Sequence, residues 1–116
     1  IHHVAVIATD YTRSRHFYAE ILGLPVIREH RREADWKIDF QLGDAELELF
    51  VKPDAPPRKS YPEAQGLRHL AFRVAETAEA LRKADVRVEP LRTDAYTGKA
   101  MCFFFDPDGL PLELHE

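Results

Sequence analysis

The sequence is poor in cysteine, in long apolar runs and in net positive charge, and each shortage excludes a class of protein. Cys102 is the only cysteine among 116 residues, so neither an internal disulfide nor a four-thiolate zinc site can form. No apolar run is long enough to cross a bilayer. The formal net charge of −4 argues against a protein that coats nucleic acid. We therefore expect no nucleic-acid partner and no membrane partner.

The composition that is left is that of a folded domain. Hydrophobic residues make up 45% of the chain and charged residues 31%, which is too apolar for a disordered protein. A length of 116 residues argues for one compact unit rather than two independent domains. Because the chain has one thiol and no segment like a signal peptide, we expect a reducing, cytoplasmic location.

Two short motifs recur along the chain in the same order and at nearly the same spacing. The motif His-Val-Ala-Val begins at His3, and a similar motif, His-Leu-Ala-Phe, begins at His69, 66 residues later. The motif Leu-Glu-Leu is centred on Glu48 and again on Glu113, 65 residues later. One matching tripeptide would mean little, but two matches in register indicate a duplicated module.

The first half of the chain is predicted to contain one helix and four strands. Asp10 is a suitable N-cap for the helix, and Gly23 suits its left-handed C-terminal end. Apolar and polar residues alternate along residues 36–42 with the period of a strand, and the Gly43-Asp44 pair suits a tight hairpin turn. The predicted strands are residues 1–8, 25–33, 36–42 and 45–51.

The second half repeats this order after a proline-rich segment. Residues 53–66 contain four prolines and are interpreted as a linker between module 1, residues 1–52, and module 2, residues 67–116. Asp106-Pro107-Asp108-Gly109 has the residues of a type I turn. The predicted elements are a helix at 77–85 and strands at 67–74, 86–93, 99–105 and 110–116.

Alternation along the strands places the repeated ionisable residues opposite the apolar faces. If both modules form one curved sheet, His3, Glu48, His69 and Glu113 could meet on its concave side. Two imidazoles and two carboxylates suit a divalent ion such as Zn²⁺, Ni²⁺, Mn²⁺ or Fe²⁺. The alternative is that they are two surface glutamates and two ordinary histidines, since charged residues are mostly exposed.

These motifs resemble the vicinal oxygen chelate (VOC) superfamily, which includes glyoxalase I, bleomycin-resistance proteins and extradiol dioxygenases. The opening of the chain is similar to its first signature, with His3, Asp10, Phe17-Tyr18 and Leu22-Gly23, and the segment 106–114 is similar to its closing signature. The resemblance implies an α+β fold in which two tandem βαβββ modules form a curved mixed sheet (glyoxalase/bleomycin resistance/dihydroxybiphenyl dioxygenase fold) in a single VOC domain, 1–116. Length and the His-His start are most similar to small bacterial glyoxalase-like members of the YaeR type.

Carried over to this chain, the resemblance implies one divalent ion (Zn, Ni, Co, Mn or Fe) per site, with His3, Glu48, His69 and Glu113 as its metal ligands. Extradiol dioxygenases and fosfomycin-resistance proteins usually have two histidines and one glutamate, so Glu48 favours a glyoxalase-like member. Glutathione-using glyoxalases commonly carry an arginine where this chain has Ile7, which weakens the case for glutathione as co-substrate. The resemblance also implies a homodimer.

The function predicted from this set is that of a metal-dependent glyoxalase I-like lyase or isomerase. It would act on a small carbonyl or thiol-adduct substrate, with the ion stabilising an enediolate. A glutamate would move the proton, with Glu113 the first choice of catalytic base and Glu48 the second. The alternative is a non-catalytic module of the same fold that binds a small molecule, for example for resistance.

The basic residues near position 30 and the histidine beside His3 also allow a role in binding. Arg28, His30, Arg31 and Arg32 could bind an anionic substrate, or they could form the solvated edge of a sheet, where charge also blocks aggregation. His2 adjoins His3, but alternation predicts that it points to the opposite face and is not a ligand.

Overall fold

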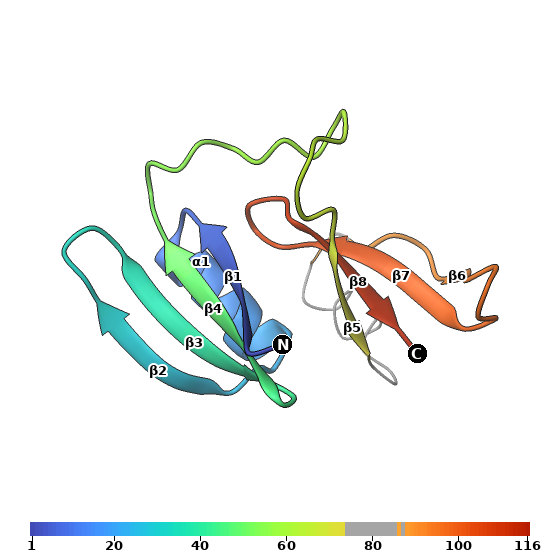
Figure 1. The fold of residues 1–116 in the computed structure, drawn as a ribbon, viewed down its shortest axis with the longest axis horizontal. Coiled ribbons are helices and arrows are strands. Elements are labelled where there is room, and N and C mark those ends of the chain that lie inside the picture. The colour runs from blue at the N-terminus through green and yellow to red at the C-terminus, as the bar shows by residue number, and fades with distance from the viewer. Residues whose placement is uncertain (74–85, 87) are drawn as a thin grey trace. The chain divides into compact units, whose positions relative to one another are not determined.

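The structure is a computed structural model that describes residues 1–73, 86 and 88–116. The chain divides into two compact units, Ile1–Pro57 and Arg58–Glu116, and each contains a four-stranded mixed sheet (Figure 1). This confirms the predicted α+β fold with two modules. The predicted helix at 77–85 lies outside the described residues. None of the helices in the described part of the chain is long and apolar enough to span a membrane.

The sheet of the first unit has the strand order β1-β4-β3-β2, in which β1 is parallel to β4 and the other neighbours are antiparallel. Its last two strands have the predicted bounds, and the first two are shorter than predicted. The elements are β1 (His3–Ala8), α1 (Tyr11–His16), the π-helical turn η1 (Phe17–Ile21), β2 (Val26–Arg31), β3 (Trp36–Leu42) and β4 (Ala45–Val51).

The helical segment covers one face of this sheet (Figure 1). The Asp10 side chain accepts a hydrogen bond from the backbone N–H of Arg13 at 2.8 Å, as expected of an N-cap. The second half of the segment is π-helical rather than α-helical, because the N–H of Leu22 bonds to the carbonyl of Phe17, five residues earlier. Gly23 then adopts the left-handed conformation, with φ 71°, as predicted.

The core of the first unit lies between this segment and the sheet. Leu47, Leu49 and Val51 are buried, and so are Val6 and Ala8 on the neighbouring strand β1. The tyrosine ring of η1 reaches the same core and lies 5.9 Å from the ring of a phenylalanine of β3. Because side chains alternate along a strand, burial of these residues turns the remaining residues of β1 and β4 to the opposite face.

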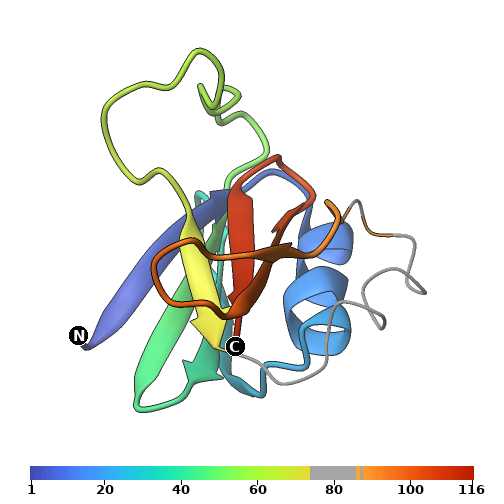
Figure 2. The same ribbon diagram turned by 90° about the vertical axis from the view of Figure 1, so that its right-hand side faces the viewer.

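The sheet of the second unit has the equivalent order, β5-β8-β7-β6. Its first strand is again parallel to its last strand, and Figure 2 shows β5 and β8 side by side in the same direction. The strands are β5 (Leu70–Arg73), β6 (Arg92–Thr93), β7 (Ala100–Phe105) and β8 (Pro111–His115). The two sheets therefore share one topology, as a duplicated module requires.

One predicted strand of the second unit is much shorter than expected. Within residues 86–93 the described residues form an isolated bridge between Val88 and Phe104, and then the two-residue strand β6. Pro90 stands between these two pairings and has no N–H to donate to a sheet, which explains the break. The Asp106–Gly109 turn forms as predicted, with the Gly109 N–H donating to the Asp106 carbonyl at 3.0 Å.

Candidate metal centre

The first module brings His3 and Glu48 together on the exposed face of its sheet. β1 and β4 pair in parallel, with Ala5 opposite Glu48, so the side chain two residues before Ala5 can reach the glutamate. Nε2 of His3 lies 3.5 Å from Oε2 of Glu48. The glutamate side chain is largely buried, with 15% of its surface exposed, whereas the histidine is 43% exposed.

The second module repeats this arrangement with His69 and Glu113. Ala71 lies opposite Glu113 on the parallel pair β5 and β8, and His69 again precedes the alanine by two residues. Nε2 of His69 lies 3.0 Å from Oε2 of Glu113, and this pair is less exposed than the first, at 25% and 9%. Each module thus joins its own predicted histidine and glutamate. The reason is that in both modules the histidine lies two residues before an alanine that pairs with the glutamate.

The distances within the two pairs suit joint coordination of an ion. Ligand atoms about 2.1 Å from a divalent ion are about 3.0–3.5 Å apart when they occupy adjacent positions of a tetrahedron or octahedron. The observed separations of 3.0 Å and 3.5 Å lie in this range. An imidazole nitrogen and a carboxylate oxygen are also ligands that zinc, nickel, manganese and iron accept. The donor set of each pair therefore fits a divalent metal.

Glu48 also contacts a lysine, Lys37, which the sequence did not indicate. Nζ of Lys37 lies 3.0 Å from Oε1 of Glu48, the oxygen that does not face His3. The same ammonium also contacts the carboxylate of Asp39, at 2.8 Å and 3.1 Å. One oxygen of Glu48 is thus held by Lys37 while the other faces the imidazole, an arrangement that orients a carboxylate ligand from its outer side.

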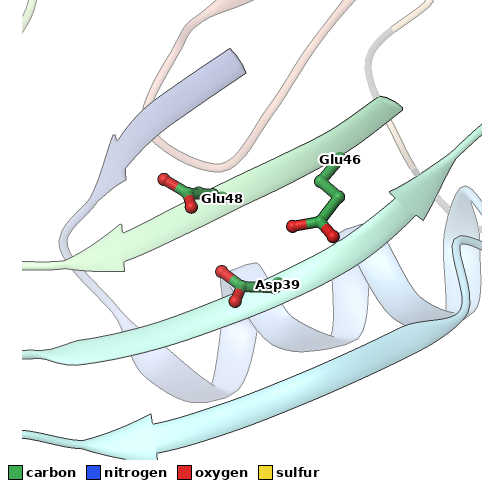
Figure 3. A group of neighbouring side chains, drawn as sticks. All are labelled: Asp39, Glu46 and Glu48. Carbon is green, nitrogen blue, oxygen red and sulfur yellow. The ribbon is translucent and has the colours of Figure 1, made fainter. Parts of the chain in front are cut away.

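Three carboxylates gather beside this lysine and form an acidic cluster of Asp39, Glu46 and Glu48 (Figure 3). One oxygen of each lies within 4.8 Å of the others, and two cationic side chains neutralise part of the negative charge of the cluster. Arg28 donates to Asp39 at 2.8 Å and to Glu46 at 2.5 Å. Burial alone would raise the pKa of Asp39, yet its bonds to Lys37 and Arg28 lower that pKa overall. We interpret the cluster as an ion-pair network.

Glu113 has very different neighbours. Phe103 of β7 lies opposite Glu113, in the position that Asp39 holds opposite Glu48. The Phe103 ring also meets the His69 ring edge-on, at 5.2 Å between centroids. Among the described residues the only ion pair of Glu113 is the one with His69. The two glutamates are therefore equivalent in register but opposite in surroundings, one beside a cation and the other beside an aromatic ring.

A cavity of about 830 Å³ lies in the second unit and includes His69 and Glu113 in its lining. Phe103 and Phe105 contribute apolar surface. Residues 58–61, which precede the strands of this unit, form another part of the wall. The sequence assigned those residues to a linker, so the cavity is a feature that sequence reasoning missed.

The three arginines of the basic cluster at β2 are engaged in ion pairs and ring contacts. Besides the bonds of Arg28 described above, Arg32 donates to both oxygens of Asp35 at 2.6 Å. Arg31 lies over the ring of Trp36, with its guanidinium carbon 5.4 Å from the ring centroid. These contacts favour the interpretation as a charged sheet edge, since β2 is the outer strand.

The expected orientation of His2 is wrong, whereas its exclusion from the ligands stays a prediction. Its Nδ1 lies 2.8 Å from Nδ1 of His3, and the two rings meet edge-on at 5.1 Å between centroids. The reason is that β1 begins at His3, so the alternation of a strand does not extend to the preceding residue. A hydrogen bond at Nδ1 leaves Nε2 of His3 directed to Glu48, and such a bond fixes the orientation of a ligating imidazole.

The fold and these paired sites agree with a family assignment by comparison. Residues 1–114 match the model of the Glyoxalase/Bleomycin resistance protein/Dioxygenase superfamily. The chain therefore belongs to this superfamily, the vicinal oxygen chelate family that its motifs resemble.

Individual relatives cover nearly the whole chain. The YaeR protein of Escherichia coli (strain K12) is 51% identical over 122 residues, which cover 100% of this chain and 95% of YaeR. The solved structure of a glyoxalase family protein from Enterococcus faecalis is 54% identical, with a TM-score of 0.90, over 100% of this chain and 96% of that chain. The metallothiol transferase FosB of Staphylococcus saprophyticus is 31% identical, over 99% of this chain and 75% of FosB.

Proposed function

We propose that this protein is a metal-dependent lyase or isomerase of the glyoxalase I type, with His3, Glu48, His69 and Glu113 as ligands of one divalent ion. The observation that carries the proposal is the repeated histidine–glutamate pair, with donor atoms 3.5 Å and 3.0 Å apart in the two modules. Neither pair alone supplies the three or more protein ligands usual at a catalytic metal, whereas both together supply four.

A divalent ion bound there would act as a Lewis acid on the oxygens of a small carbonyl substrate. The residues of the chain then move a proton between two adjacent carbons. A carboxylate takes the proton from the carbon beside the carbonyl, and the electron pair of that C–H bond passes toward the carbonyl. The carboxylate returns the proton to the neighbouring carbon, so the substrate is isomerised without gain or loss of atoms.

Glu113 is the proposed base because, among the described residues, no lysine or arginine contacts its carboxylate, which faces Nε2 of His69. Glu48, by contrast, accepts a hydrogen bond from Lys37 through Oε1, so one of its oxygens is already engaged. Glu113 also lines the cavity of the second unit, which supports a role beside a bound substrate. These contacts favour Glu113 as base and Glu48 as a fixed ligand.

The relatives support metal chemistry on a small molecule. FosB is named a metallothiol transferase, and the Enterococcus faecalis structure is named a glyoxalase family protein. We propose a thiol adduct of a small carbonyl compound as the substrate class, a homodimer as the assembly and the cytoplasm as the location. Whether the ligands of one ion come from one chain or from two is part of the test of this assembly.

The second candidate is a non-catalytic module that binds a small molecule for resistance. The size of the cavity and the bleomycin-resistance proteins named in the matched superfamily favour this candidate. The two functions differ in their need for metal. Protein purified without chelator and analysed for bound metals is expected to contain about one divalent ion per site if it is the enzyme. Failure to take up added Zn²⁺, Ni²⁺, Co²⁺, Mn²⁺ or Fe²⁺ would instead favour the binder.

Activity is tested with the adducts of methylglyoxal with glutathione and with bacterial thiols, each with the metal-loaded protein. We expect isomerisation of at least one adduct and loss of that turnover in Glu113→Gln. Solvent deuterium should enter the product if the proton passes through a carboxylate that exchanges with water. Full turnover by Glu113→Gln would remove this residue from the role of base.

A further inference from the structure

The cavity of the second unit is lined by as many basic as acidic side chains, but not every basic side chain has an acidic partner. Its lining contains four basic side chains, Arg58, Lys59, Arg68 and Arg92. Two of them are already neutralised, since Arg68 contacts Glu63 at 2.5 Å and Arg92 contacts Glu89 at 2.8 Å.

The other acidic residues of the lining are also engaged. Asp94 accepts hydrogen bonds from the N–H groups of Tyr96 and Thr97 and lies 3.4 Å from Nε2 of His115, while Glu113 pairs with His69. Neither Arg58 nor Lys59 has an ion pair with any residue that the structure describes. Two basic residues of the lining, Arg58 and Lys59, therefore have no ion-pair partner among the described residues.

Arg58 is held in place although its charge is not paired. Its Nε donates to Oγ of Ser60 at 2.5 Å, and its Nη2 donates to the carbonyl of Leu67 at 3.1 Å. These two bonds join Arg58 to two other residues of the segment before β5 and fix the plane of the guanidinium. An arginine has five N–H donors, so donors are left over for a ligand. A fixed planar guanidinium favours carboxylate, phosphonate and phosphate groups, which it can bind through two parallel hydrogen bonds.

The lining of the cavity also contains apolar side chains. Met101, Phe103 and Phe105 line the same cavity, and Phe103 touches the His69 ring. A ligand that fits such a cavity has an anionic group at one end and an apolar body along the aromatic side chains. In a cavity lined by both charged and apolar side chains, a charge-assisted contact to an unpaired cation favours anionic ligands over neutral ones.

We propose that the cavity selects small organic anions, and that Arg58, assisted by Lys59, binds their carboxylate, phosphonate or phosphate group. The apolar part of the ligand lies against Met101 and Phe103, which leaves the far end toward His69 and Glu113. The placement of the ligand's far end beside His69 and Glu113 rests on the proposed function, because it treats that end of the ligand as the part that reacts. Anion binding itself depends only on the second unit and does not need a metal.

The test measures binding to metal-free protein, so that no anion can be held by a metal ion. Benzoate and phenylphosphonate are the anionic probes, and benzamide is the uncharged probe with the same ring. Each is titrated into ¹⁵N-labelled protein, and the NMR shifts of the Arg58, Lys59 and Ser60 amides are followed. We expect both anions, or one of the two, to bind at least about tenfold more tightly than benzamide, because charge-assisted hydrogen bonds are lost with the neutral probe. Binding of only one anion assigns the preferred head group.

Two substitutions locate the anion contact. Arg58→Gln should weaken anion binding by about tenfold, and Arg58→Lys should recover part of it because the charge is kept. Arg68→Gln is the matched control from the same cavity, and we expect less than about a threefold change because that guanidinium is already paired. Arg58 and Arg68 are both exposed, so the substitutions leave the core intact, and the NMR spectrum checks the fold.

Three results would overturn the proposal. They are equal affinity for benzamide and the anions, unchanged affinity in Arg58→Gln, and an equal loss in Arg58→Gln and Arg68→Gln. The last would show that total charge rather than a built site attracts the anion. The proposed metal-dependent function can fail separately, since metal-free protein could bind the anions even if no ion ever bound His69 and Glu113.

Discussion

Nε2 of His69 lies 3.0 Å from a carboxylate oxygen of Glu113, on two parallel strands that reproduce the register of His3 and Glu48 in the first module. The repetition matters because a single histidine–glutamate contact is common as an ordinary ion pair. Two contacts built in the same way on duplicated strands support the proposal that both pairs serve one ion. The predictions below follow from this relationship and from the differences between the two modules.

Loss of either histidine should impair binding of the same ion. We expect His3→Ala and His69→Ala each to weaken Zn²⁺ or Ni²⁺ affinity by more than the roughly 10–100-fold that loss of an outer-shell residue causes. Calorimetric titration of metal-free protein measures this affinity. His16→Ala is the control, since His16 is exposed on α1 and contacts only Glu20 among the pairs described. Unchanged affinity in either test variant would show that the two modules do not share one ion.

Metal removal should also lower thermal stability. An ion that binds only the folded state adds to the free energy of unfolding in proportion to the logarithm of its concentration over its Kd. We expect the Tm of the wild-type protein to fall when a chelator is added and to recover with excess Zn²⁺. The His3→Ala/His69→Ala double variant should show no such response. A Tm that is indifferent to chelator in the metal-loaded wild-type protein would contradict the proposed centre.

Substitution of Glu113 and substitution of Glu48 should have different effects on turnover and on metal affinity. Glu113→Gln removes the proposed base, so turnover at saturating metal should fall by about 10²–10⁴-fold. Glu48→Gln should chiefly weaken metal affinity, and excess metal should restore much of its turnover. Glu46→Gln is the control from the same strand, because Glu46 pairs with Arg28 and is not a proposed ligand. The reverse pattern would exchange the roles of Glu48 and Glu113.

Lys37 should matter to the metal although it is not a ligand. The substitution Lys37→Met gives the first module the residue that the second module has at the equivalent position, Met101. Because Oε1 of Glu48 then loses its partner, metal affinity should fall by about tenfold. Lys99→Met, at an exposed site of the second unit, should leave the affinity unchanged. Equal affinity in both variants would remove Lys37 from a positioning role.

Asp35 should contribute stability that depends on pH. Hydrogen bonds from Arg32 and Lys52 hold the pKa of Asp35 well below its usual value. A lowered pKa in the folded state stabilises the protein above the ordinary aspartate pKa of about 4, and that stabilisation is lost as the pH falls further. The Tm of Asp35→Asn should therefore lie below that of the wild-type protein at pH 7, and the difference should shrink below about pH 4.

A matched variant separates this effect from general acid unfolding. Asp54 is exposed and forms no ion pair with a described residue, so Asp54→Asn should have nearly the wild-type Tm throughout. Thermal unfolding followed by circular dichroism at pH 3, 5 and 7 measures the comparison. A Tm difference for Asp35→Asn that does not change with pH would contradict the role of its charge.

Much of the local structure could be predicted because it depends on near neighbours in the sequence. The bounds of β3 and β4 follow from alternation and from the Gly43-Asp44 turn, in which Gly43 has φ 58°. The strand around Val88 was predicted too long, because Pro90 has no N–H to donate and the pairing of the sheet is interrupted there.

The candidate site, too, could be predicted in part from the sequence, and the rest depended on the tertiary structure. Which face His3, Glu48, His69 and Glu113 occupy is determined by the sequence, since the side-chain period of a strand is two and the apolar residues must be buried. That Lys37 holds Glu48, that Phe103 lies opposite Glu113, and that Arg58 lines a cavity were decided only by the tertiary structure. Those contacts depend on the register between strands and on the path of a proline-rich segment, and neither is encoded by residues that are adjacent in the chain.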